Sequence, residues 1–141
     1  MSPRDTRTGI VLEKMILPAL EQGGYKFETQ KVIGNRPNGR KHKIDVIASK
    51  EGEKEILISL KWQQVGGTAE QKVPFEVICL AEELINHSDK YKAAYLVLGG
   101  NGWTLRDYYV SGNLDKHLRN SHLINILTLE TFISKSNRGL L

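Results

Sequence analysis

The stretches Ile44-Asp45-Val46-Ile47 and Ile56-Leu57-Ile58-Ser59-Leu60-Lys61-Trp62-Gln63 decide how this chain folds. Both are apolar segments of strand length, and each carries one charged side chain in its interior, Asp45 in the first and Lys61 in the second. Burying an aspartate or a lysine costs several kcal/mol unless the charge is paired or binds a metal. Two such charges on neighbouring strands therefore predict a shared role.

The elements around these strands alternate between helix and strand. We predict a helix over 8–22, strands over 25–33, 43–49 and 55–63, a helix beginning near Pro74, a strand over 93–98, a short helical stretch ending at Leu118, a strand over 123–129 and a helical turn over 130–135. Thr8 is expected to cap the first helix, and Pro18 to kink its last turn. This order predicts an α/β fold with a mixed central β-sheet flanked by helices, its antiparallel part first.

Composition sets the broad class of the protein. The chain has 141 residues, of which 40% are hydrophobic and 26% charged, and this predicts a single domain over 1–141 with an ordinary core. We expect no membrane segment, because no apolar run approaches the roughly 20 residues that span a bilayer. The N-terminal residues do not resemble a signal peptide, and the single cysteine, Cys79, cannot form a disulfide framework. A cytoplasmic location is therefore expected.

A basic segment precedes Asp45. Between residues 31 and 43 the chain has no acid, and an Asn38-Gly39 pair predicts a hairpin turn. The candidate DNA-binding residues are Lys31, Arg36, Arg40, Lys41, His42 and Lys43. Taken alone, such a segment is typical of a solvated hairpin, but its position directly before Asp45 favours a β-ribbon that enters the DNA major groove. Arg36 and Arg40 are expected to read guanine edges, and the lysines to contact phosphates.

The strand over 55–63 has a polar end on one face. Ser59, Lys61 and Gln63 alternate with apolar residues, and a hairpin through Glu51-Gly52 would bring Lys61 close to Asp45. An aspartate and a backbone carbonyl are suitable ligands for Mg²⁺, and a lysine beside them offsets charge that develops on a phosphate. This pattern predicts phosphodiester hydrolysis. The alternative is a partly buried ion pair without a catalytic role.

These residues resemble the pattern of the PD-(D/E)XK nuclease superfamily, which has the restriction-endonuclease fold. The resemblance is carried by Glu13, Gly23-Gly24-Tyr25, Ile44-Asp45, Ser59-Leu60-Lys61 and the helix that follows them. It implies that Asp45 holds a metal, that Lys61 is catalytic and that the backbone carbonyl of Leu60 is a further metal ligand. Within the superfamily, the chain is most similar to a homing endonuclease of cyanobacterial group I introns.

One departure from the family pattern affects the chemistry. Ser59 stands where the resemblance implies a second acid, while Ile44 replaces only the name-giving proline. Glu13 is the first choice to supply the missing carboxylate as a catalytic and metal-binding residue, and Gln63, or its neighbour Gln64, would act through water or orient the phosphate. Glu70 and Glu76 are alternatives, although Glu76 reads more readily as an ordinary exposed helix acid.

The expected function is Mg²⁺-dependent, sequence-specific cleavage of double-stranded DNA by a homing or restriction endonuclease, with Mn²⁺ as a substitute metal. Because each site cuts one strand, a homodimer or homotetramer is expected. Two alternatives remain open. The first is a structure-specific resolvase of the Holliday-junction type, and the second is a catalytically inactive DNA-binding module on the nuclease fold.

Overall fold

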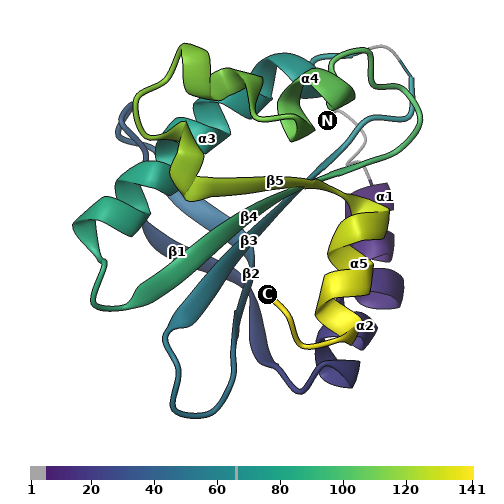
Figure 1. Ribbon diagram of the computed structural model, residues 1–141, viewed down its shortest axis with the longest axis vertical. Coiled ribbons are helices and arrows are strands. Elements are labelled where there is room, and N and C mark those ends of the chain that lie inside the picture. The colour runs from purple at the N-terminus through teal and green to yellow at the C-terminus, as the bar shows by residue number, and fades with distance from the viewer. Residues whose placement is uncertain (1–5, 66) are drawn as a thin grey trace.

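The computed structural model describes residues 6–65 and 67–141 and contains one mixed β-sheet (Figure 1). Its five strands lie in chain order: β1 (Lys26–Asn35), β2 (Lys41–Ser49), β3 (Glu55–Trp62), β4 (Tyr91–Gly99) and β5 (Ile124–Thr128). The pairings β1–β2 and β2–β3 are antiparallel, whereas β3–β4 and β4–β5 are parallel. The predicted α/β fold, with a mixed sheet whose antiparallel part comes first, is confirmed.

Helices cover both faces of this sheet. One face packs against α1 (Thr6–Val11), η1 (Leu12–Ile16), α2 (Leu17–Gln22) and α5 (Leu129–Asn137). The other face packs against α3 (Ala69–Asn86), α4 (Arg106–Val110) and the 3₁₀ turns η2 (Asn113–Lys116) and η3 (Ser121–Leu123). Each face has its own apolar core, because side chains of a strand alternate between the two sides of the sheet. No helix within the described ranges is long and apolar enough to cross a membrane.

The first helix is interrupted by a π turn next to its proline. The backbone N–H of Leu17 donates to the carbonyl of Leu12, five residues earlier, and Pro18 follows at once. Proline has no N–H to donate, so a local change in the helical hydrogen bonds is expected beside it. The irregular turn thus lies before Pro18, over Leu12–Ile16, whereas the last turn, where the change was predicted, is regular α-helix. The helix is already formed at Thr6, so Thr8 is not its cap.

Helix α3 begins at Ala69, before the predicted start, and Pro74 lies inside it. A residue at position 74 would normally donate its N–H to the carbonyl of Glu70, four residues earlier. In the structure the hydroxyl of Tyr109 donates to that carbonyl instead, at 2.7 Å. The missing donor is thus replaced from α4, and this is why the helix continues through a proline that was predicted to mark its start.

The alternation of side chains between the two faces of the sheet is interrupted in β2, at Asp45. Ile44 belongs to the apolar core under α3, whereas Val46 belongs to the core under α2 and α5. Residues two apart in a regular strand share a face, so the strand bends between these two positions. Asp45 occupies the bend and is half-buried.

Candidate active site

Asp45 lies where β2 and β3 separate. Their regular pairing runs from Ala48↔Ile56 to Val46↔Ile58. Beyond it, Oδ2 of Asp45 accepts a hydrogen bond from the backbone N–H of Leu60 at 2.7 Å. Burial raises the pKa of the Asp45 carboxyl above its ordinary value, more than the Leu60 N–H and the charge of Lys61 lower it. The nearby charge of Glu76 raises it further.

Glu76 on α3 is the centre of the charged network. Its carboxylate is contacted by four side chains: Nη1 of Arg36 at 3.0 Å and Nε2 of His42 at 3.1 Å on Oε1, and Oγ of Ser59 at 3.0 Å and Nζ of Lys61 at 3.3 Å on Oε2. The His42 contact is close in distance but is not aligned as a hydrogen bond. Glu76 is only 4% exposed, so its interpretation as an exposed helix acid is wrong.

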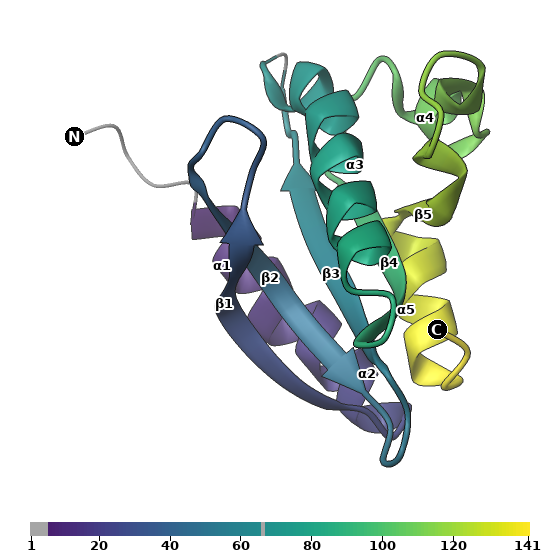
Figure 2. The ribbon, with the colours of Figure 1, turned by 90° about the vertical axis from the view of Figure 1, so that its left-hand side faces the viewer.

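The positive neighbours keep Glu76 ionised. Burial alone would raise the pKa of this carboxyl, but His42, Lys61 and Arg36 together hold it well below its ordinary value. A buried carboxylate is thereby placed against Lys61 at the same end of the sheet as Asp45. Figure 2 shows α3 lying along β3, with the β1–β2 hairpin projecting at the end of the sheet where α3 begins.

Ser59 has a defined partner in this arrangement. It is buried on β3 and donates its hydroxyl to Glu76 rather than facing solvent. A carboxylate at this position would place a second negative charge against Glu76 in a buried setting, which is unfavourable. The serine on the strand and the glutamate on the helix are therefore compatible with each other, whereas two acids would not be.

The other acids considered as replacements lie elsewhere. Glu13 is exposed on η1, and none of the hydrogen bonds or ion pairs around Glu76 described above involves it. The carboxylate of Glu70 accepts the backbone N–H groups of Thr104 and Leu105, the latter at 2.9 Å, and the Thr104 hydroxyl at 2.7 Å. Glu70 thus holds the start of α4 and is not available at the site.

Gln63 also has structural partners. Its amide nitrogen donates to the carbonyl of Gly102 at 2.8 Å, and its amide oxygen accepts the backbone N–H of Glu70 at 3.3 Å. Both ends of the side chain are therefore held by backbone groups, joining the end of β3 to α3 and to the loop after β4. These bonds give Gln63 structural partners, and its catalytic role stays a prediction.

The basic hairpin divides into two sets of side chains. Arg36 and His42, predicted to contact DNA, point inward to Glu76, and His42 is 1% exposed, so a direct contact of His42 with DNA is wrong. The exposed members are Lys31, Arg40, Lys41 and Lys43. Lys31 lies 3.6 Å from Glu28 on the same strand. The exposed residues remain the candidates for DNA contact.

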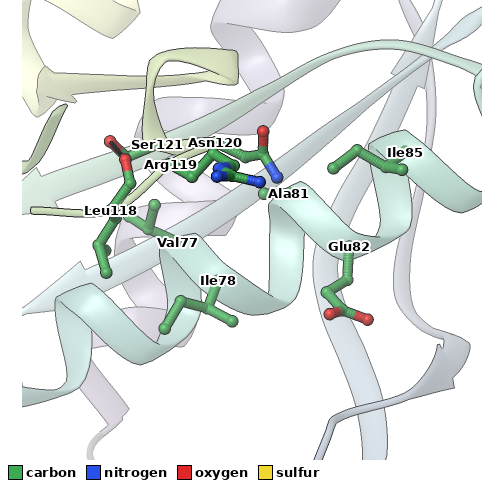
Figure 3. Close-up of a pocket in the computed structure, with 9 residues that line it drawn as sticks. All are labelled: Val77, Ile78, Ala81, Glu82, Ile85, Leu118, Arg119, Asn120 and Ser121. Atoms are coloured by element: carbon green, nitrogen blue, oxygen red, sulfur yellow. Dashed lines mark hydrogen bonds between the residues drawn. The ribbon is translucent and has the colours of Figure 1, made fainter.

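A small cavity on α3 lies away from these charges. It has a volume of about 150 Å³ and lies between α3 and residues 118–121 (Figure 3). Its walls include Val77, Ala81 and Leu118, with Glu82 and Arg119 as its charged groups. Asp45, Lys61 and Glu76 do not line it, so the candidate active site is not this cavity.

Sequence reasoning misplaced Glu76 although a signal was present. Val73, Val77 and Leu80 are the buried apolar residues of α3, and Glu76 lies three residues after the first and four before the last. This spacing places Glu76 on the buried side of the helix. A charged residue on that side requires a partner, and Lys61 was already known to need one.

Comparisons with known proteins give one matching family and two similar solved structures. The family model of the PD-(D/E)XK nuclease superfamily domain matches residues 4–140. The crystal structure of an XisH family protein from Nostoc punctiforme superposes with a TM-score of 0.56 at 16% identity, covering 86% of this chain and 94% of that one. The crystal structure of AF1548, a protein of unknown function, gives a TM-score of 0.48 at 14% identity over 80% of this chain, which spans 54% of that protein.

No curated protein matches the sequence. Neither of the two structures is described as a homing endonuclease, so that narrower resemblance stays a prediction. The family match extends over nearly the whole chain. Within it, Asp45 on β2 and Lys61 on β3 lie where these two strands separate. The chain therefore belongs to the PD-(D/E)XK nuclease superfamily.

Proposed function

We propose that this protein is a metal-dependent DNA endonuclease whose active site consists of Asp45, Lys61 and Glu76. The observation that carries the proposal is the placement of these residues at one end of the sheet: Glu76 lies 3.3 Å from Lys61, and Asp45 accepts the N–H of Leu60, the residue before Lys61. Glu76 takes the role that Glu13 was expected to have. A carboxylate from α3 thus compensates for Ser59.

The donor set fits a hard divalent cation. Among residues 6–65 and 67–141 there is no group of three or more histidine, cysteine or acidic side chains that could hold a metal. Two carboxylates and a backbone carbonyl remain, and oxygen ligands with additional waters are what Mg²⁺ and Mn²⁺ accept. Asp45, Glu76 and the carbonyl of Leu60 would hold the ion, which when bound activates water and neutralises phosphate charge.

The side chains of the site would divide the remaining work. Lys61 is partly exposed, so its ammonium group can approach a phosphate while it contacts Glu76. A positive charge held there offsets the charge that develops on the phosphate during hydrolysis. Arg36 and His42 hold Glu76 from its other oxygen, which fixes the orientation of this carboxylate.

Double-stranded DNA is the proposed substrate. The exposed basic residues of the hairpin, Lys31, Arg40, Lys41 and Lys43, lead into the strand that bears Asp45. A two-stranded ribbon fits the major groove, and its lysines would bind phosphates. Recognition of a defined sequence, as in homing or restriction enzymes, and a homodimer or homotetramer that cuts both strands are part of this proposal.

The test is cleavage of supercoiled plasmid DNA in Mg²⁺, in Mn²⁺ and in EDTA. We expect nicking or linearisation in either metal and none in EDTA, and we expect Asp45→Asn and Glu76→Gln to abolish it while DNA binding persists. Glu82→Gln is the matched control, because Glu82 is an exposed acid on the same helix. Full cleavage by a folded Asp45→Asn or Glu76→Gln protein would contradict the assignment of the site.

A second function is favoured by one specific observation. Both oxygens of Glu76 already have protein partners, and this would also stabilise a DNA-binding module that has lost catalysis. Binding without cleavage in either metal would support that module. A structure-specific resolvase would instead cleave a four-way junction in preference to a linear duplex of the same sequence.

A further inference from the structure

Gln30, in the middle of β1, has an unusual backbone conformation. Its φ is 56°, and within the described part of the chain every other residue with a positive φ is a glycine. Side chains disfavour this left-handed region because Cβ crowds the following carbonyl. Such residues persist where their surroundings fix them, and they gather at functional sites.

The position of Gln30 in the sheet is defined by its neighbours. Thr29 pairs with Val46, and Lys31 pairs with Ile44, so Gln30 lies opposite Asp45. This is the point where the buried side chains of β2 change face. The pairing register of the two strands is the same before and after this point, so β1 and β2 bend together.

The geometry points to Gln30 as a positioning residue for Asp45, the proposed metal ligand. Its left-handed backbone lets β1 follow the bend of β2, and its side-chain amide holds the Asp45 carboxylate in the orientation in which Oδ2 meets the N–H of Leu60. This inference rests on the proposed function for the role of the metal, but the positioning of Asp45 can be measured without any metal.

Two observations support a role for the side chain as well as for the backbone. Gln30 lies opposite Asp45 in the antiparallel pair, and side chains of directly opposite residues are close enough to interact. Glycine would adopt a φ of 56° without steric cost. A glutamine at this position therefore supplies something that the backbone alone does not require, and the group it adds next to Asp45 is an amide.

The experiment compares Gln30→Gly with Thr29→Gly in metal-free protein and with Mn²⁺. Gln30→Gly removes the amide but keeps the bend, whereas Thr29→Gly removes a neighbouring exposed side chain from the same strand. The readouts are the thermal midpoint, the NMR shift and hydrogen-exchange protection of the Leu60 amide, and Mn²⁺ affinity by calorimetry without DNA.

We expect Gln30→Gly to keep or raise the thermal midpoint, to lose protection at Leu60, and to bind Mn²⁺ about 10–100-fold more weakly, as is typical when a partner of a metal ligand is lost. Thr29→Gly should lower the thermal midpoint. It should leave the NMR shift and the exchange protection of the Leu60 amide unchanged, and also the affinity for Mn²⁺. An unchanged Leu60 amide in Gln30→Gly would overturn the inference. If the Leu60 amide changes in Gln30→Gly but the unaltered protein binds no Mn²⁺, the positioning role is supported and the proposed metal site is refuted.

Discussion

At the scale of single residues, the two charges that stand out in the sequence have different partners: Lys61 contacts Glu76, and Asp45 accepts the backbone N–H of Leu60. Asp45 and Lys61 were predictable because each interrupts an apolar strand, and interruption of a buried pattern is visible locally. Glu76 was named only as an alternative and expected to be exposed, because its partner Arg36 lies 40 residues away in the chain and only the folded sheet brings α3 over β3. Arg36 and His42 were expected to face DNA for the same reason, because their partner Glu76 lies far from them in the sequence.

The first prediction concerns Lys61. Loss of a positioned charge that acts in the transition state typically lowers the rate by about 10²–10³-fold. We expect Lys61→Ala to reduce the single-turnover rate of plasmid cleavage by that order, with the metal concentration that gives half-maximal rate little changed. A rate near that of the unaltered protein would leave Lys61 as an ion-pair partner of Glu76 only. Lys54→Ala is the control, because Lys54 directly precedes the opposite end of β3.

The second prediction concerns acid stability of the metal-free protein. The Glu76 carboxyl has a pKa below its ordinary value of 4.5 in the folded state, so the unfolded chain binds its proton first as pH falls. The stabilisation by Glu76 is therefore complete above pH 4.5 and is lost as the pH falls below that value toward the folded pKa. Urea unfolding at a series of pH values in EDTA measures this loss.

Glu76→Gln provides the comparison for that measurement. This variant should be less stable than the unaltered protein at neutral pH, by about 1–3 kcal/mol, because Arg36 and Lys61 lose their anion. Its free energy of unfolding should also decline less steeply below pH 4.5. Equal slopes for the two proteins would show that Glu76 does not carry the acid sensitivity.

At the scale of elements, the strands were predicted better than the helix boundaries. All five strands were placed within two residues at each end, because apolar runs bounded by turn residues mark them clearly. The predicted start of α3 is wrong, because the prediction placed Pro74 in the first turn of the helix. A tertiary hydrogen bond from Tyr109 overrides that local rule, and no pattern within the helix announces it.

The third prediction tests this replacement of a donor. Tyr109→Phe leaves the carbonyl of Glu70 buried without its hydroxyl partner and should cost about 1–3 kcal/mol of stability. Pro74→Ala restores a backbone N–H at the position that normally serves this carbonyl. Tyr109→Phe should therefore cost clearly less when combined with Pro74→Ala. Equal costs in both backgrounds, measured by chemical unfolding, would show that the two donors are independent.

At the scale of the whole molecule, a mixed sheet flanked by helices, with its antiparallel part first, followed from the alternation of helix and strand patterns. The layout of charge did not follow from the sequence. The hairpin was read as a uniformly basic ribbon, but a hairpin has two faces, and α3 covers one of them. Arg36 and His42 on the covered side bind Glu76, while Arg40 and Lys41 remain exposed.

The fourth prediction separates these two sides of the hairpin. Lys41→Ala should weaken binding to all DNA sequences and reduce the slope of log affinity against log salt by about one, as expected for one lost phosphate contact. Arg40→Ala should cost about 1–3 kcal/mol at one base position if it grips a guanine. Binding titrations on singly substituted sites at several salt concentrations measure both effects. Unchanged affinity in both variants would place the DNA elsewhere.

The change of face in β2 has a consequence for how the chain tolerates changes in length. A slip of one residue would bring an exposed lysine, Lys41 or Lys43, to the buried position of His42. A slip of two would replace Asp45 with Lys43 or Ile47 opposite the Leu60 N–H. Neither shift gives an alternative pairing of similar energy. Single-residue insertions and deletions should accordingly be accepted in the exposed turn at 37–39 and rejected within β2, so that the hairpin can vary in length without moving Asp45.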